Sequence, residues 1–168
     1  MIATMNPGAA VMRAQYFRFE ADFVEDNVRC IPMIVRFKLD AVGIKLKLAE
    51  WSRFREDERI MLAEEPCTIK GEQEIYSNFL QRLIRVRTGN EPTQIKIPGE
   101  PAWSQLEVIE PALQDKAKEY NWIITIRQWK SLSDLQRFAL LKLYRPGHEN
   151  RNFPRAMREF GLGVEKVG

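Results

Sequence analysis

The residues best suited to chemistry lie in a polar loop near the C-terminal end of the 168-residue chain. This loop, residues 145–154, contains Gly147, Asn150 and the only histidine, His148. Four arginines lie in it or just beyond it: Arg145, Arg151, Arg155 and Arg158. Closely spaced arginines ahead of a helix bind a phosphate, carboxylate or nitrate ion, or an acidic patch of a partner protein. An ordered connector, in which His148 and Asn150 bond the local backbone, explains the same residues equally well.

Positive charge gathers around this loop. The last 48 residues hold nine Lys and Arg against four Asp and Glu, whereas the rest of the chain is slightly acidic. The whole chain has 26 basic and 23 acidic residues, a formal net charge of +3. Because nucleic-acid binding needs a strong basic field, this balance argues against a dedicated nucleic-acid binder. The local excess fits a small anion or a protein partner.

The two cysteines are a second chemical possibility. Cys30 follows Arg29, which favours a lowered thiol pKa, but an isolated cysteine is more often a small buried hydrophobic residue. A thiol enzyme that uses Cys30 or Cys67 as nucleophile and His148 as base requires a fold that joins them. Two cysteines are too few for a disulfide framework, and with one histidine they predict no metal site.

The familiar catalytic sequence motifs are absent. The chain has no glycine-rich phosphate loop, no H-E-x-x-H, no G-x-S-x-G and no dinucleotide-binding fingerprint. We therefore expect no catalytic residues and no bound cofactor. No apolar run reaches the roughly 20 residues of a membrane span, and the first twenty residues lack a signal-peptide pattern. A cytoplasmic protein without membrane contact is the expectation.

These candidate residues must be positioned by a mainly helical domain. With 45% apolar residues, the length suits one compact core, which we expect over residues 16–163, with a flexible lead-in at 1–15 and a tail at 164–168. About six helices and little or no sheet are predicted: 32–42, 48–64, 71–87, 111–120, 133–144 and a short one from Pro154 to Gly161. Apolar residues alternate over 17–23, which predicts a short strand, and residues 89–104 read as a long loop.

The segment 32–42 fits two interpretations. Its alternating apolar residues are typical of a strand, but Pro32 suits the start of a helix and Gly43 suits its end. Because both end signals agree, helix is favoured.

A pattern around tryptophan occurs twice. Trp51 and Trp129 are each followed by an arginine eight positions later and a leucine eleven positions later: Arg59 and Leu62, then Arg137 and Leu140. Each set predicts a short helix that holds the tryptophan, a bend, and a second helix. A buried tryptophan beside an arginine stem mostly fills core, so we interpret the pattern as a repeated helical hairpin with a structural role.

Several segments resemble one known family. They are residues 19–23 (FEADF), 29–33 (RCIPM), 38–40 (KLD), 43–46 (GIKL), 136–143 (QRFALLKL), 145–150 (RPGHEN) and 159–162 (EFGL). Together they are similar to the nitrate reductase-associated protein family over roughly residues 17–162. The resemblance implies an accessory protein of the cytosolic assimilatory nitrate reductase of photosynthetic bacteria, an enzyme with a molybdenum–pterin cofactor and an iron–sulfur cluster. It implies no catalytic residues, and two cysteines are too few to hold a cluster that normally takes four.

Two functions compete on this basis. The first is an accessory or maturation factor that binds nitrate reductase through residues 145–158, together with Arg29, Cys30 and Arg36. The second is a carrier or sensor that holds a small anion or the pterin cofactor with the same basic loop. A concave pocket lined by arginines favours the second function, and a convex basic patch favours the first.

Overall fold

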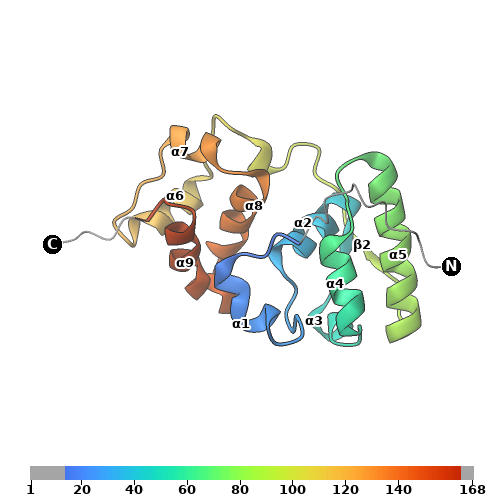
Figure 1. The fold of residues 1–168 in the computed structure, drawn as a ribbon. Coiled ribbons are helices and arrows are strands. Elements are labelled where there is room, and N and C mark those ends of the chain that lie inside the picture. The colour runs from blue at the N-terminus through green and yellow to red at the C-terminus, as the bar shows by residue number, and fades with distance from the viewer. Residues whose placement is uncertain (1–13, 164–168) are drawn as a thin grey trace, which may run out of the picture.

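The computed structural model describes residues 14–163, apart from the side chains of His148 and Glu149. The described chain is mainly helical, as predicted, with one two-stranded sheet (Figure 1). The elements in chain order are η1 (Arg18–Glu20), α1 (Ala21–Val24), α2 (Met33–Val42), β1 (Ile44–Lys45), α3 (Leu48–Trp51), α4 (Glu56–Glu64), α5 (Lys70–Thr88), β2 (Thr93–Gln94), η2 (Ala102–Ser104), α6 (Pro111–Lys118), α7 (Ile126–Ser131), α8 (Asp134–Leu143), η3 (His148–Arg151) and α9 (Asn152–Glu159).

The described residues form nine α-helices, against the six or so that were expected. The six helices with eight or more residues lie where the sequence predicted helices, and the three others are short. No helix in the described range is long and apolar enough to span a membrane. The expected lead-in, except for residues 14 and 15, and the expected tail lie outside the described residues.

Helix α2 begins and ends at the predicted signals. Pro32 is its N-cap residue, and Gly43 ends it in the left-handed conformation with φ of 69°. A Cβ at Gly43 would lie 2.8 Å from the carbonyl oxygen of Ile95. The backbone approaches this closely because β1 pairs antiparallel with β2, with Ile44 opposite Gln94. The predicted long loop at 89–104 therefore contains a strand and, further on, the short helix η2.

Two sequence expectations about elements are wrong. Residues 17–23 form the helical turns η1 and α1 rather than a strand, because a side chain inside the segment satisfies its backbone: Glu20 accepts the N–H of Phe17 at 3.1 Å. Residues 48–64 are two helices instead of one. The chain turns after Trp51, and α4 starts afresh where Glu58 accepts the N–H of Arg55 at 2.8 Å.

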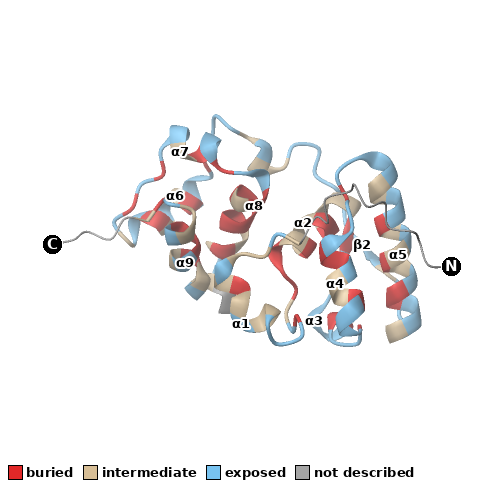
Figure 2. Ribbon diagram, in the orientation of Figure 1, coloured by how far each residue is buried: buried red, intermediate tan, exposed pale blue. Residues whose placement is uncertain are grey.

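The buried side chains form two hydrophobic clusters with α2 between them. One cluster lies among α2, α3, α4 and α5, and the other among α6, α7, α8 and α9 (Figure 1). Met33 of α2 belongs to the second cluster, whereas Val35 and Leu39 of the same helix belong to the first. In Figure 2 the buried residues of α5 face α4, which is typical of an amphipathic helix. Helix α2 thus joins both cores.

The two tryptophan patterns make matching contacts, one in each cluster. Trp51 and Trp129 are fully buried, and each indole N–H donates to a loop carbonyl, that of Val28 at 2.8 Å and that of Gln105 at 2.7 Å. Each arginine eight residues later donates back to the carbonyl of its tryptophan, Arg59 at 3.2 Å and Arg137 at 3.3 Å. Leu62 and Leu140 are fully buried. The contacts are those of a structural unit.

Candidate functional site

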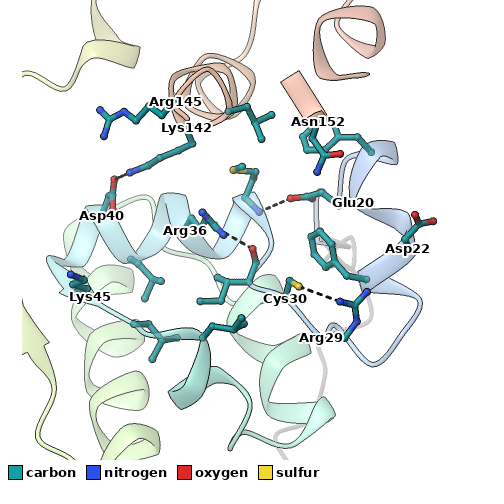
Figure 3. A pocket seen from close by; sticks show the side chains of 18 of the residues that line it. Glu20, Asp22, Arg29, Cys30, Arg36, Asp40, Lys45, Lys142, Arg145 and Asn152 are labelled. Atoms are coloured by element: carbon teal, nitrogen blue, oxygen red, sulfur yellow. Dashed lines mark hydrogen bonds and ion pairs between the residues drawn. The ribbon is translucent and has the colours of Figure 1, made fainter. Parts of the chain in front are cut away.

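An open cleft of about 1030 Å³ lies where residues 19–48 and residues 142–155 come together. Its walls are η1 and α1, the loop before α2, α2 itself, β1, the end of α8 and the start of α9. In Figure 3, α2 crosses the middle of the cleft, with Lys142 and Arg145 on one side and Cys30 and Arg29 on the other. Segments more than 100 residues apart in the chain therefore form one site.

The cleft unites six of the ten candidate binding residues. They are Arg29, Cys30 and Arg36 from the N-terminal half, and Arg145, Arg151 and Arg155 from the C-terminal part. The sequence suggested both groups, and the packing of α2 against α8 brings them together.

The other four candidates do not line the cleft. Asn150 donates to the carbonyls of Tyr144 and Arg145, at 3.4 and 3.1 Å, and so closes the turn after α8, as the connector interpretation expected. The guanidinium of Arg158 lies over the ring of Trp122, 5.4 Å from its centroid. Gly147 is exposed in the loop, and the side chain of His148 is outside the described part of the chain. A ligand role for His148 stays a prediction.

The sequence reasoning missed five charged residues of the cleft: Glu20, Asp22, Asp40, Lys45 and Lys142. All five lie inside segments that carry the family resemblance, which was the available signal. With them, the lining has seven basic and three acidic side chains, a formal excess of four positive charges. This excess is larger than the net charge of +3 of the whole chain, so the remainder of the protein is close to neutral. The cleft is where the protein concentrates its positive charge.

The basic side chains of the cleft differ in their partners. Lys142 forms an ion pair with Asp40 at 3.2 Å, and Arg29 forms one with Asp26 at 2.9 Å. Arg36 donates to the carbonyl of Ile31 at 3.2 Å. The three other arginines are exposed and make no ion pair with any described residue: Arg145, Arg151 and Arg155. The wall made by the end of α8, the turn after it, η3 and α9 therefore presents guanidinium groups that are ready to bind an anion.

A buried carboxylate stands at one end of the cleft. Glu20 is 1% exposed and accepts the N–H groups of Met33, at 2.7 Å, and Phe17, at 3.1 Å. Met33 is the first residue of α2, so this carboxylate sits at a helix N-terminus. Burial raises the pKa of Glu20 to about 7, although both backbone hydrogen bonds and Arg36 oppose the shift. As pH rises through about 7, Glu20 therefore loses its proton and the net positive charge of the cleft falls.

Nearly half of the cleft lining is apolar, and this apolar part is called the floor here. It comprises ten aliphatic, aromatic or Met residues, among them Phe19, Phe23 and Leu143. Leu48 is 55% exposed and Ile95 is 40% exposed, so apolar surface lies open to water in the same cleft as the basic groups. A ligand with both anionic and apolar groups would cover it.

A strained turn positions Arg29 and Cys30. Asn27 and Val28 have φ of 55° and 47°, which is unusual for residues other than glycine and especially for a β-branched one. The first tryptophan pattern holds this turn, because Trp51 donates to the carbonyl of Val28 and Arg59 to that of Asn27, at 2.8 Å each. The hydrogen bonds of Trp51 and Arg59 thus fix the wall of the cleft that carries Arg29 and Cys30.

The two thiols lie in different surroundings. Cys30 is half-buried in the cleft, and the guanidinium of Arg29 donates to its Sγ at 3.7 Å. Cys67 is buried in the first hydrophobic cluster, away from the cleft lining. Burial raises the pKa of Cys67 to about 11, and the nearby Lys38 opposes this shift only in part. At neutral pH the Cys67 thiol is therefore protonated.

The comparisons with known proteins identify the family. The family model described as conserved nitrate reductase-associated protein matches residues 16–160. The chain belongs to this family. The match confirms the resemblance found in the sequence, and it includes every lining residue of the cleft. Comparisons with curated proteins and with solved structures give no significant match.

Proposed function

We propose that the protein is a non-catalytic accessory factor that binds the molybdenum-dependent assimilatory nitrate reductase in the cytoplasm and supports its maturation. The description of its family supports an association with nitrate reductase. The observation that carries the binding role is the exposure of Arg145, Arg151 and Arg155, which lack ion-pair partners among the described residues; the concave shape around them bears on the second candidate function below. An exposed group of like charges without ion-pair partners among the described residues is typical of a surface that binds an oppositely charged partner.

A thiol enzyme is less well supported than an accessory factor. Its nucleophile would have to be a thiolate, and burial keeps the Cys67 thiol protonated at neutral pH. Cys30 has an arginine neighbour and lines the cleft, so replacing Cys30 tests whether it acts as the nucleophile of a thiol enzyme. If the Cys30→Ser variant supports reductase activity as well as the wild type, no thiol chemistry is needed.

Deletion and complementation test the proposed function. In the deletion strain we expect nitrate reductase to be made but to have several-fold lower activity and a lower molybdenum content per polypeptide. The wild-type gene restores both quantities. Normal activity and normal molybdenum content in the deletion strain would contradict the proposal.

The shape of the cleft favours a second candidate function, a carrier or sensor of a small anion or of the pterin cofactor. A concave site with arginines on both sides is what that function requires, and its volume suits a nucleotide-sized ligand better than nitrate. Calorimetry with nitrate and with a pterin nucleotide tests it. Saturable heat at micromolar ligand supports the carrier, and no heat at millimolar ligand excludes it.

A further inference from the structure

The basic groups of the cleft are spread around it. Arg145 and Lys142 lie on one side of α2, Lys45 and Arg29 lie on the other, and Arg36 lies between them on α2 (Figure 3). A compact anion engages two or three such donors at one point. Lys142 and Arg29 already pair with Asp40 and Asp26, so a ligand that reaches Arg145 on one side and Lys45 on the other needs anionic groups placed apart from one another. Carboxylates along a polypeptide have this arrangement.

The apolar floor adds a second requirement. Leu48 and Ile95 are more than a third exposed within the cleft, and Phe19 and Phe23 also line it. An inorganic or purely ionic ligand would leave this surface in contact with water. A peptide segment that has apolar side chains among its carboxylates covers the apolar floor and pairs with the basic side chains of the cleft at the same time.

The chain's own ends have the wrong charge for this role. Residues 1–13 contain no Asp or Glu and include Arg13. Residues 164–168 contain one Glu and one Lys, so they carry no net negative charge. Neither of these two segments therefore supplies the carboxylates that complement the cleft.

We infer that the cleft between α2 and the α8–α9 wall binds an acidic, partly apolar segment of nitrate reductase. This inference rests on the proposed function, because it names the part of the reductase that the protein recognises. The segment has a net negative charge and carries aliphatic or aromatic side chains that lie on the floor around Leu48 and Ile95.

Photocrosslinking locates the segment. The full-length protein carries a benzophenone amino acid in place of Leu48, which is 55% exposed in the cleft, and is irradiated with its own reductase. The matched control carries the same group in place of Ile75, which is 68% exposed on α5 and does not line the cleft. We expect a crosslink from position 48 to a reductase segment rich in Asp and Glu. A crosslink to a segment without net negative charge would overturn the inference.

Charge reversal tests the recognition chemistry. The double variant Arg145→Glu/Arg155→Glu is compared with Arg127→Glu, a control at an exposed position of α7 outside the cleft. A synthetic peptide with the crosslinked sequence should bind the double variant at least about tenfold more weakly than the wild type. The control should bind it as the wild type does. Equal affinity for all three proteins would overturn the inference, as would displacement of the peptide by micromolar phosphate or nitrate, which indicates a small-anion site.

Capture of the intact reductase separates this inference from the proposed function. If the wild type and the double variant capture the reductase equally well, the cleft is not the docking site and the accessory role stands. If the wild type captures none, the proposed function itself fails. Loss of capture only in the double variant supports both.

Discussion

The carboxylate of Glu20 accepts the backbone N–H of Met33 at 2.7 Å, across thirteen positions of the chain, while Glu20 is only 1% exposed. This contact places a buried acid at the first residue of α2 and in the wall of the cleft. It also ties the N-terminal segment to the helix that takes part in both hydrophobic clusters. Stability and the charge of the cleft therefore depend on the same group.

The raised pKa of Glu20 predicts a pH-dependent stability. Burial moves this pKa from 4.5 to about 7, so the folded protein holds a proton that the unfolded chain releases. The free energy of unfolding should therefore fall as pH rises from about 4.5 to about 7, by up to roughly 3 kcal/mol, and the contribution is absent above that range. Urea denaturation between pH 4.5 and 8.5 measures it. In Glu20→Gln most of this dependence of the free energy of unfolding on pH should vanish. The control is Glu74→Gln, at an exposed position of α5, which should keep it. An unchanged pH dependence in Glu20→Gln would contradict the raised pKa of Glu20.

The two arginines of the tryptophan patterns should differ in their effect on stability. Arg137 is 5% exposed and donates to the carbonyls of Trp103, Trp129 and Leu132, so Arg137→Ala leaves buried acceptors unsatisfied. We expect a loss of about 3 kcal/mol in the free energy of unfolding. Arg59 is partly exposed, and water can replace its bonds, so Arg59→Ala should cost about 1 kcal/mol. Urea denaturation of the two variants measures both losses. A larger loss for Arg59→Ala than for Arg137→Ala would contradict the deeper burial of Arg137.

Gly43 should tolerate no side chain. It has a positive φ, and an added Cβ would lie 2.8 Å from the carbonyl oxygen of Ile95 in the paired strand segment. Gly43→Ala should therefore lower the free energy of unfolding by about 2 kcal/mol or more. In Gly71→Ala the new Cβ on α5 meets nothing within 4 Å, so this control should be neutral or slightly stabilising. Equal thermal midpoints for the two variants would refute the packing described here.

The two cysteines should react at different rates. Cys30 lines the open cleft, whereas Cys67 is buried and has a pKa of about 11. In the native protein at pH 7.5, iodoacetamide should modify Cys30 first, and Cys67 should become reactive mainly after denaturation. Mass spectrometry of the digested protein follows both sites. Modification of Cys67 at the rate of Cys30 would contradict its burial.

The sequence predicts the long helices because local signals define them. Pro32 and Gly43 bound α2, and Ser133 caps α8 with its side chain. The error at residues 17–23 has a physical cause: the alternation of Phe17, Phe19 and Phe23 predicts a strand, but Glu20 and the distant Glu159 satisfy the backbone of that segment. A side chain more than 130 positions away leaves no local signal.

The cleft could be predicted only in parts. The sequence suggested Arg29, Cys30 and Arg36 together with the basic loop as one contact region, but no sequence feature gave a physical reason for the two groups to lie close together. That step depends on α2, which packs against both α5 and α8. The burial of Glu20 and the pairing of Lys142 with Asp40 likewise arise only when the two halves meet.

The proposed function is that the protein binds nitrate reductase to support its maturation. Its most direct test is capture of the purified reductase by the immobilised full-length protein, comparing cofactor-free with cofactor-loaded enzyme. We predict that the cofactor-free form is captured several-fold more strongly than the loaded form, and that Arg127→Glu behaves as the wild type. Capture of neither form would contradict the claim, and equal capture of both would contradict its maturation part.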